Sequence, residues 1–145
     1  MELKMKLLPV SEPTIRYSPS IDHFSSILNL HIDKTLPWII ENYIEVVFNS
    51  SPGANYFLAE FLDIYKFWWN CPFITVSRME RILVDDLVST IKNAIDRGLY
   101  VMVVIDTYYI SEYVTYQREH IPHEIFVHGY GDNFFFVSDY FDFNS

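Results

Sequence analysis

The sequence contains a single cysteine, Cys71, among its 145 residues. A lone cysteine cannot form an internal disulfide, which agrees with a reducing compartment, and it excludes a metal cluster built on several cysteines. Basic residues are also scarce, with 10 Lys and Arg against 19 Asp and Glu and a net charge of −9. This charge repels phosphate backbones and anionic membrane surfaces, so we expect neither nucleic acid nor membrane as a partner.

Long hydrophobic runs are missing as well. The longest, such as Tyr100 to Ile105, are far shorter than the roughly 20 residues that span a bilayer. Met1 to Val10 has neither the apolar stretch nor the small-residue cleavage site of a signal peptide. We therefore expect a cytoplasmic protein. Aromatic residues, at 18% of the chain, supply ample surface to bury in a single core.

Prolines mark the beginning of the chain. Pro9, Pro13 and Pro19 fix their own φ angles and bias the preceding residues toward extended geometry. We expect residues 1–20 to form an extended arm with one short strand, and residues 21–145 to form one domain.

Apolar residues at helical spacing predict four helices after this arm. They are a helix capped by Ser20 or Asp22, a second from Pro37 to Val47, a third from Tyr56 to Trp69 and a fourth from Ser77 to about Arg97. For the fourth helix, Ser77 and Glu80 have the spacing of a capping box, and Gly98 supplies a stop.

Strand patterns follow. Leu99 to Ile105 is continuously apolar and β-branched, which predicts a strand covered on both faces. His123 to Tyr130 and Phe134 to Ser138 predict a hairpin, joined by the turn residues 131–133. Because the helices precede the sheet, the sequence indicates an α+β fold.

Three histidines, His120, His123 and His128, fall within nine residues. On a strand His123 and His128 point to opposite faces, so we expect no metal site and no cofactor. We interpret His128 as a sheet histidine and His120 as a solvated loop residue.

His123 and Asp139 lie at nearly equal distances from the turn of the predicted hairpin, so their side chains are expected to meet. A carboxylate beside an imidazole holds the ring in one tautomer and stabilises its protonated form, as in sites where a histidine activates a nucleophile. The alternative is an ordinary cross-strand contact at the edge of a sheet.

The segment from His123 to Asp139 resembles the histidine and aspartate hairpin of papain-like cysteine peptidases, particularly the bacteriocin-leader peptidase domains. The chain is also similar to the N-terminal domain of the butirosin biosynthesis protein H family and related proteins of peptide-synthetase gene clusters. The residues that carry this second resemblance are Tyr17 to Asn29, Pro37-Trp38 and Ile105 to Tyr109. The resemblance implies a papain-like α+β fold, with N-terminal helices packed on a C-terminal antiparallel sheet.

The resemblance also implies an acyl-transfer site of cysteine, histidine and aspartate, with the cysteine at the N-terminus of the first long helix. Placing Ser26 to Asn29 on the family's helix puts this nucleophile at or near His23, and no cysteine lies between residues 9 and 49. His23 and Ser25 are the candidates there, beside His123 and Asp139.

Ser25 has the alternative role of a helix-forming or capping serine. Cys71 is interpreted as a structural residue packed among Trp68, Trp69 and Phe73, because buried cysteines of this kind are inert.

Two functions follow as expectations. The first is a papain-like domain of peptide or secondary-metabolite biosynthesis, related to enzymes that transfer aminoacyl or peptidyl thioesters, with little or no activity because the cysteine is missing. The second is a non-catalytic binding module for an acyl or peptidyl group or for a carrier protein. A carrier protein or a small acyl substrate is the expected partner. The distance from His123 to the nearest Ser, Cys or Thr side chain distinguishes the two.

Tyr108, Tyr109, Tyr113 and Tyr116 form a cluster that lines a groove for a ligand or partner, or else covers a loop and a sheet edge. The high aromatic content favours a homodimer or a docking surface. Only six residues follow Asp139. Either Met1 to Val10 and a partner chain close the sheet edge, or the domain is the front part of a larger protein.

Overall fold

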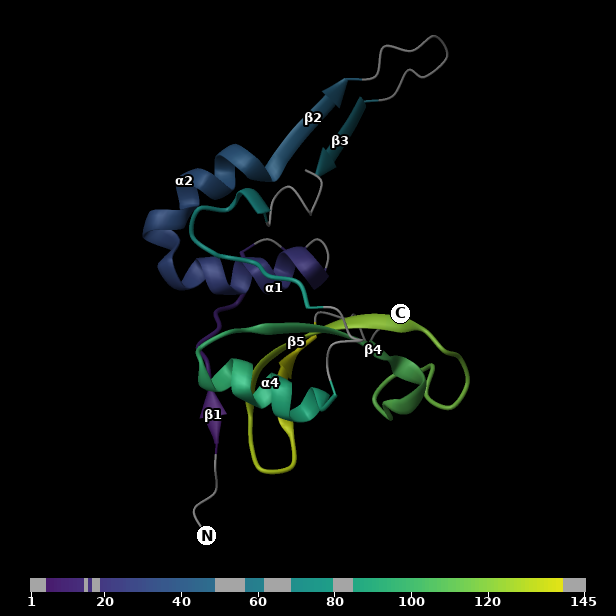
Figure 1. Ribbon diagram of the computed structural model, residues 1–145. Helices are drawn as coiled ribbons and strands as arrows, with labels where there is room; N and C mark the ends of the chain where they lie inside the picture. Colours follow the sequence, from purple (N-terminus) through teal and green to yellow (C-terminus); the bar gives the residue numbers. More distant parts are fainter. Residues whose placement is uncertain are drawn as a thin grey trace.

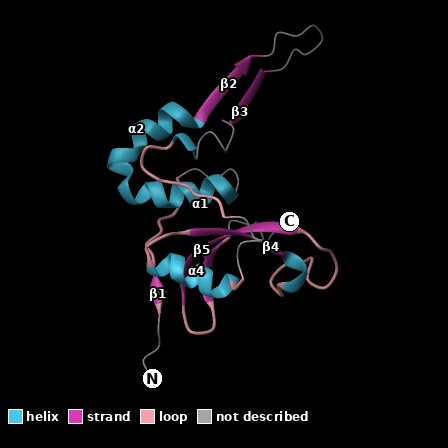
Figure 2. Ribbon diagram, in the orientation of Figure 1, coloured by secondary structure: helices cyan, strands magenta, loops and turns pink. Residues whose placement is uncertain are grey.

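The protein has an α+β architecture in which one antiparallel sheet lies between helices (Figure 1). The computed structural model describes residues 5–14, 16, 19–48, 57–61, 69–79 and 85–139. Within these residues, helix α4 lies on one side of the sheet, and helices α1 and α2 lie on the other (Figure 2).

The four strands of the main sheet are β1 (Lys6–Leu7), β4 (Val101–Asp106), β5 (Pro122–Tyr130) and β6 (Phe135–Ser138). β5 is the central strand and pairs antiparallel with each of the other three. β4 pairs with the first part of β5, from Pro122 to Val127, and β6 pairs with its last part, from Phe126 to Tyr130. The hairpin predicted from the sequence is confirmed.

Side chains on the two faces of β5 form different contacts because successive residues of a strand point in opposite directions. Val127 packs with Ile91 and Ile95 of α4 (Leu87–Asp96) in a buried cluster. Phe126 stacks instead on His23 of α1 (Pro19–Leu28). The helices on both faces thereby bury the central strand.

A second buried cluster joins the N-terminal helices. It contains Phe24 and Leu28 of α1, Ile39 of α2 (Ile32–Tyr43), and Cys71. A short 3-10 helix, η1 (Asn29–His31), connects α1 to α2, and the Thr35 hydroxyl donates to the carbonyl of Leu28 at 3.0 Å. This hydrogen bond fixes the turn between the two helices.

The predicted second and third helices need correction. The second helix ends at Tyr43, and Ile44–Phe48 forms strand β2, which pairs with β3 (Phe57–Phe61) inside the predicted third helix. Both segments are rich in β-branched or aromatic residues, whose preference for strands is realised once a partner strand is present. Tyr56 and residues 62–68 of the predicted third helix lie outside the described residues, and only Trp69 and Asn70 have helical backbone.

The start of the predicted fourth helix is wrong as well. Residues 77–79 are not helical, Glu80 lies outside the described residues, and α4 begins at Leu87. The cap is Asp86, whose carboxylate accepts hydrogen bonds from the backbone N–H of Ser89 at 3.1 Å and from its hydroxyl at 2.6 Å. The predicted stop is confirmed, because Gly98 follows the helix with φ of +80°.

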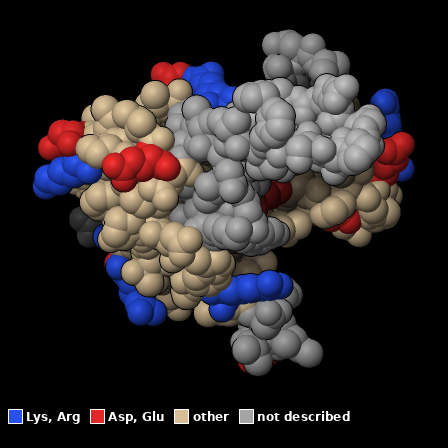
Figure 3. Space-filling model, turned by 90° about the horizontal axis from the view of Figure 1, so that it is seen from above, with Lys and Arg blue, Asp and Glu red and all other residues tan. Residues whose placement is uncertain are grey.

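Strand β4 is not covered on both faces as predicted, since Val104 is 67% exposed. The described helices include none that is long and apolar enough to cross a membrane. Lys and Arg side chains of the described residues are scattered over the face seen in the space-filling view rather than gathered in one patch (Figure 3).

Candidate functional site

His123 and Asp139 lie in contact where strands β5 and β6 meet. His123 is the second residue of β5, and Asp139 directly follows β6. The Nε2 atom of His123 lies 2.9 Å from Oδ1 of Asp139, and the two side chains are only 12% and 13% exposed. The predicted contact between these residues is confirmed. Because an ionised carboxylate only accepts, Nε2 carries the proton and Nδ1 is the basic nitrogen of the neutral ring.

Tyr113 completes this cluster from the loop between β4 and β5. Its hydroxyl donates to Oδ2 of Asp139, and its ring meets the ring of His123 edge-on, with centroids 5.3 Å apart and an interplanar angle of 62°. Burial raises the pKa of Tyr113, and the negative charge of Asp139 raises it further. Tyr113 is therefore a neutral hydrogen-bond donor at physiological pH.

His23 approaches the same cluster from α1. Its side chain is fully buried, and its ring stacks on Phe126 with centroids 5.1 Å apart and 14° between the planes. Burial lowers the pKa of His23 from 6.5 to about 4; the charge of Asp139 opposes this shift, and His123 adds to it. His23 is thus a neutral imidazole that packs on Phe126 and whose pKa is influenced by the charges of both predicted site residues.

The helix carrying His23 is held against β5 by a specific hydrogen bond. The hydroxyl of Ser20, in the first turn of α1, donates to Oε1 of Glu124 at 2.7 Å. Glu124 is the neighbour of His123 on β5. The first turn of the helix is therefore anchored to β5 at the residue that follows His123.

Ser25 is not brought into this cluster. It is buried, but two residues along an α-helix differ by about 200° in direction, so Ser25 faces away from the side that His23 presents to Phe126. Within the described part of the chain, no hydrogen bond joins Ser25 to His123. The helix periodicity thus separates the two candidates that the sequence had placed together.

Cys71 belongs to a different cluster from His123 and Asp139. It packs with Phe24, Leu28 and Ile39, and burial raises the pKa of its thiol. The prediction of a buried cysteine is confirmed.

The neighbours predicted for Cys71 are corrected. Trp69 and Phe73 are largely exposed, and Trp68 lies outside the described residues. The hydrophobic residues packed against this cluster are instead Trp38, Ile74 and Val76.

His120 is an exposed loop residue, as expected, and it also belongs to a second histidine and aspartate pair. Its Nδ1 lies 2.7 Å from Oδ2 of Asp106, and its ring stacks on Tyr108 with centroids 4.2 Å apart. The hydrogen bond from His120 lowers the pKa of Asp106. Both residues border a shallow cavity of about 290 Å³. The pairing of Asp106 with Pro122 at the ends of β4 and β5 brings them together.

His128 lies on β5 as expected and is partly buried, which lowers the pKa of its imidazole. No group of three or more His, Cys, Asp or Glu side chains could hold a metal ion within the described ranges.

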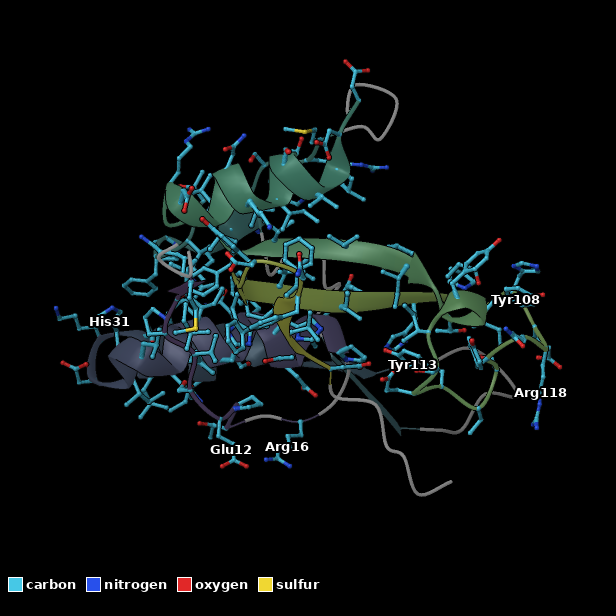
Figure 4. All side chains as sticks on the ribbon, turned by 90° about the horizontal axis from the view of Figure 1, so that it is seen from below. Glu12, Arg16, His31, Tyr108, Tyr113 and Arg118 are labelled. Atoms are coloured by element: carbon cyan, nitrogen blue, oxygen red, sulfur yellow. The ribbon has the colours of Figure 1, made fainter. Side chains whose placement is uncertain are left out.

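Tyr113 was not among the site residues predicted from the sequence. It lies 26 residues from Asp139, and no periodicity or turn arithmetic links the two. In the side-chain view, Tyr113 lies on the part of its loop nearest the sheet, whereas Arg118 lies at the far end (Figure 4). The only signal in the sequence was the density of tyrosines after the strand.

Comparisons of the chain with protein-family models, with curated proteins and with solved structures find no match.

Proposed function

We propose that the chain is a papain-like domain of peptide or secondary-metabolite biosynthesis whose acyl-transfer site has lost its nucleophile and now serves in binding. In this proposal, the domain holds an acyl or peptidyl group, delivered by a carrier protein or as a small molecule, without transferring it. The observation that carries the proposal is the place of His23.

Two features support a papain-like origin. The histidine and aspartate of the C-terminal hairpin are in hydrogen-bond contact at 2.9 Å, in the order that the family pattern implies. On the first helix, His23 aligns with the family's cysteine, and its pKa is influenced by the charges of the same pair. The interaction of His23 with this pair links segments at least 100 residues apart in sequence, whereas His123 and Asp139 are 16 residues apart in one hairpin.

The loss of the nucleophile is supported by the chemistry of position 23. A thiol is partly ionised at neutral pH, whereas His23 is a neutral ring buried against Phe126. An imidazole at this position would have to form a labile acyl adduct. General-base catalysis requires a nucleophile within hydrogen-bond reach of the histidine. In the described part of the chain, the thiol of Cys71 packs instead with Phe24, Leu28 and Ile39. A binding role is therefore favoured over acyl transfer.

The direct test restores a thiol at position 23. We expect the variant His23→Cys, made together with Cys71→Ala to remove background labelling, to react with iodoacetamide in a manner that depends on His123. Replacing His123 by Asn in this variant should slow alkylation at pH 7 at least tenfold, since the imidazole would no longer draw off the thiol proton. The wild type should show no turnover of a small acyl thioester.

The matched control is Ser25→Cys with Cys71→Ala, because this thiol would lie on the opposite side of the same helix turn. Its alkylation should not change when His123 is replaced. Thioester turnover by the wild type would overturn the inactive interpretation, and equal alkylation of His23→Cys with and without His123 would overturn the papain-like geometry. Circular dichroism melting establishes that each variant is folded.

A further inference from the structure

We infer that Tyr113 is the positioning residue of this site: its hydroxyl and ring hold Asp139 and His123 so that the Nε2–H of His123 faces Asp139 and Nδ1 is turned away from Asp139. The consequence of this ring orientation for acyl transfer rests on the proposed function, whereas the orientation of the His123 ring is independent of that function. Neither the hairpin pattern nor the family resemblance assigns a role to Tyr113.

The carboxylate of Asp139 is restrained at both of its oxygens. Each oxygen of Asp139 accepts a hydrogen bond from a different side chain, Oδ1 from His123 and Oδ2 from Tyr113. A carboxylate held at both oxygens cannot rotate about its Cβ–Cγ bond without losing a partner. If the hydroxyl of Tyr113 were removed, one oxygen in a nearly buried position would lose its donor, and the carboxylate could turn away from His123.

The backbone of Asp139 lies just beyond the paired residues of β6. The paired residues of β6 end at Ser138, opposite Phe126, so the described ladder between β5 and β6 stops one residue before Asp139. The position of the carboxylate is therefore not set by sheet hydrogen bonds alone. The side chain of Tyr113 supplies the restraint that the ladder does not.

The imidazole ring of His123 also contacts Tyr113. The ring of Tyr113 lies edge-on against the ring of His123, and Tyr113 itself is nearly buried. Aromatic rings in this arrangement attract each other and exclude water from the space between them. The same residue thus restrains both members of the pair, one through its hydroxyl and the other through its ring.

Tyr113 belongs to the loop of residues 107–121, which joins β4 to β5 and is restrained by its own hydrogen bonds. Its base and interior are tied by hydrogen bonds of ordinary length. They join His120 to Asp106 at 2.7 Å, Thr107 N–H to the Ile121 carbonyl at 3.0 Å, the hydroxyls of Thr115 and Thr107 at 2.7 Å, and Gln117 N–H to the Tyr108 carbonyl at 3.0 Å. A loop restrained in this way presents Tyr113 at little further cost in conformational entropy.

The tautomer of His123 is the readout that separates positioning from general stability. We expect long-range proton–nitrogen NMR spectra of the wild type at pH 8 to show His123 almost wholly as the Nε2–H tautomer. Tyr113→Phe keeps the ring and removes only the hydroxyl, and it should convert His123 to a mixture of both tautomers. Asp139→Asn should do so at least as strongly. Tyr109→Phe is the matched control, because Tyr109 is on the same loop but is 69% exposed, and it should leave the tautomer unchanged.

A second readout uses the restored thiol. In the His23→Cys, Cys71→Ala background, Tyr113→Phe should slow alkylation about tenfold at pH 7, the effect of one hydrogen bond to a charged group, and should change its pH profile. Tyr109→Phe should change neither.

An unchanged tautomer in folded Tyr113→Phe would overturn the inference. If the tautomer changes but alkylation of His23→Cys is independent of His123, the proposed papain-like function fails while the positioning role of Tyr113 stands.

Discussion

Burial determines the chemistry of His23. A histidine in water has a pKa near 6.5, and taking the ring out of water disfavours its charged form more than the nearby Asp139 favours it. The stack on Phe126 further fits a neutral ring. A site whose central side chain is neutral and enclosed is suited to packing against an acyl chain or to filling space, and it is unsuited to attack on a thioester.

The depressed pKa of His23 predicts a loss of stability in mild acid. Its pKa is about 4 in the folded protein and about 6.5 when unfolded, so the unfolded state takes up the proton first as the pH falls. The contribution of a neutral His23 to the free energy of unfolding is therefore complete above pH 6.5, declines between pH 6.5 and 4, and is lost below pH 4. The full loss is at most about 3 kcal/mol.

Urea unfolding of the wild type and of His23→Gln at pH 7 and pH 4.5 measures this effect. The decline between the two pH values should be smaller in His23→Gln by about 2 kcal/mol. His31→Gln serves as control, because His31 is exposed and should follow the wild type. An equal decline in the wild type and in His23→Gln would show that His23 is not the group that titrates.

At the scale of elements, the site depends on how β5 is paired along its length. A bulge between Val127 and Gly129 shifts the register between β5 and β6, and β1 meets β5 at the same place. Gly129 lies opposite Leu7 on one strand and Phe136 on the other. The absence of a side chain there allows the strands to approach closely.

Gly129→Ala tests this close approach. An added Cβ would lie 2.7 Å from the backbone carbonyl oxygen of Lys6, which cannot move without displacing β1. We expect a loss of about 1–3 kcal/mol in the free energy of unfolding, the usual cost of overpacking, measured by urea denaturation.

Gly131→Ala is the comparison, because the nearest atoms to its Cβ would belong to the ring of Phe134, an exposed side chain that can rotate. The destabilisation should be smaller there. Equal costs at the two glycines would contradict the assignment of the clash to the β1 backbone.

At the scale of the whole molecule, the two buried clusters are joined through β5. One cluster contains Ile91 and Ile95 of α4 with Val127, and the other contains Phe24, Leu28 and Ile39 with Cys71. The ring of Phe126 stacks on His23 and also on Tyr100, with centroids 5.1 and 5.4 Å apart. This continuous contact leads us to expect that the clusters unfold together.

Cys71 provides a probe of this cooperativity. Because the thiol is buried and its pKa is raised, a thiol reagent such as Ellman's reagent should label the native protein slowly and label one thiol per chain at once in urea. Ile39 lies in the cluster of Cys71, and Ile91 lies in the other cluster; each is replaced by Ala in a separate variant. Both should accelerate labelling in proportion to the stability that each loses. Acceleration by Ile39→Ala alone would indicate that the α1–α2 cluster opens independently.

Part of the site could be predicted from the sequence because it depends on local rules. The turn at residues 131–133 sets the pairing of two strands, and that pairing brings His123 and Asp139 to the same place. The stop at Gly98 and the apolar stripe with Ile91 and Ile95 likewise follow from the backbone preference of glycine and the helical period.

Other local signals misled because two structures compete for the same pattern. Ile44–Phe48 and Phe57–Phe61 each carry apolar residues that suit a helix or a strand, and only their mutual pairing decides for the strand. The capping box at Ser77 has the correct spacing, but Asp86 caps the helix that forms. Spacing alone contains no information about which of two caps is used.

The sequence by itself determined the α+β class, the hairpin and the contact of His123 with Asp139, because each depends on periodicity or on counting from a turn. The tertiary structure decided that His23 stacks on Phe126, that Tyr113 donates a hydrogen bond to the carboxylate of Asp139, and that Asp106 pairs with His120. These contacts depend on the rotation of a helix about its axis and on the path of a loop. Both are fixed only when apolar surfaces from distant segments pack together, and no short-range pattern encodes them.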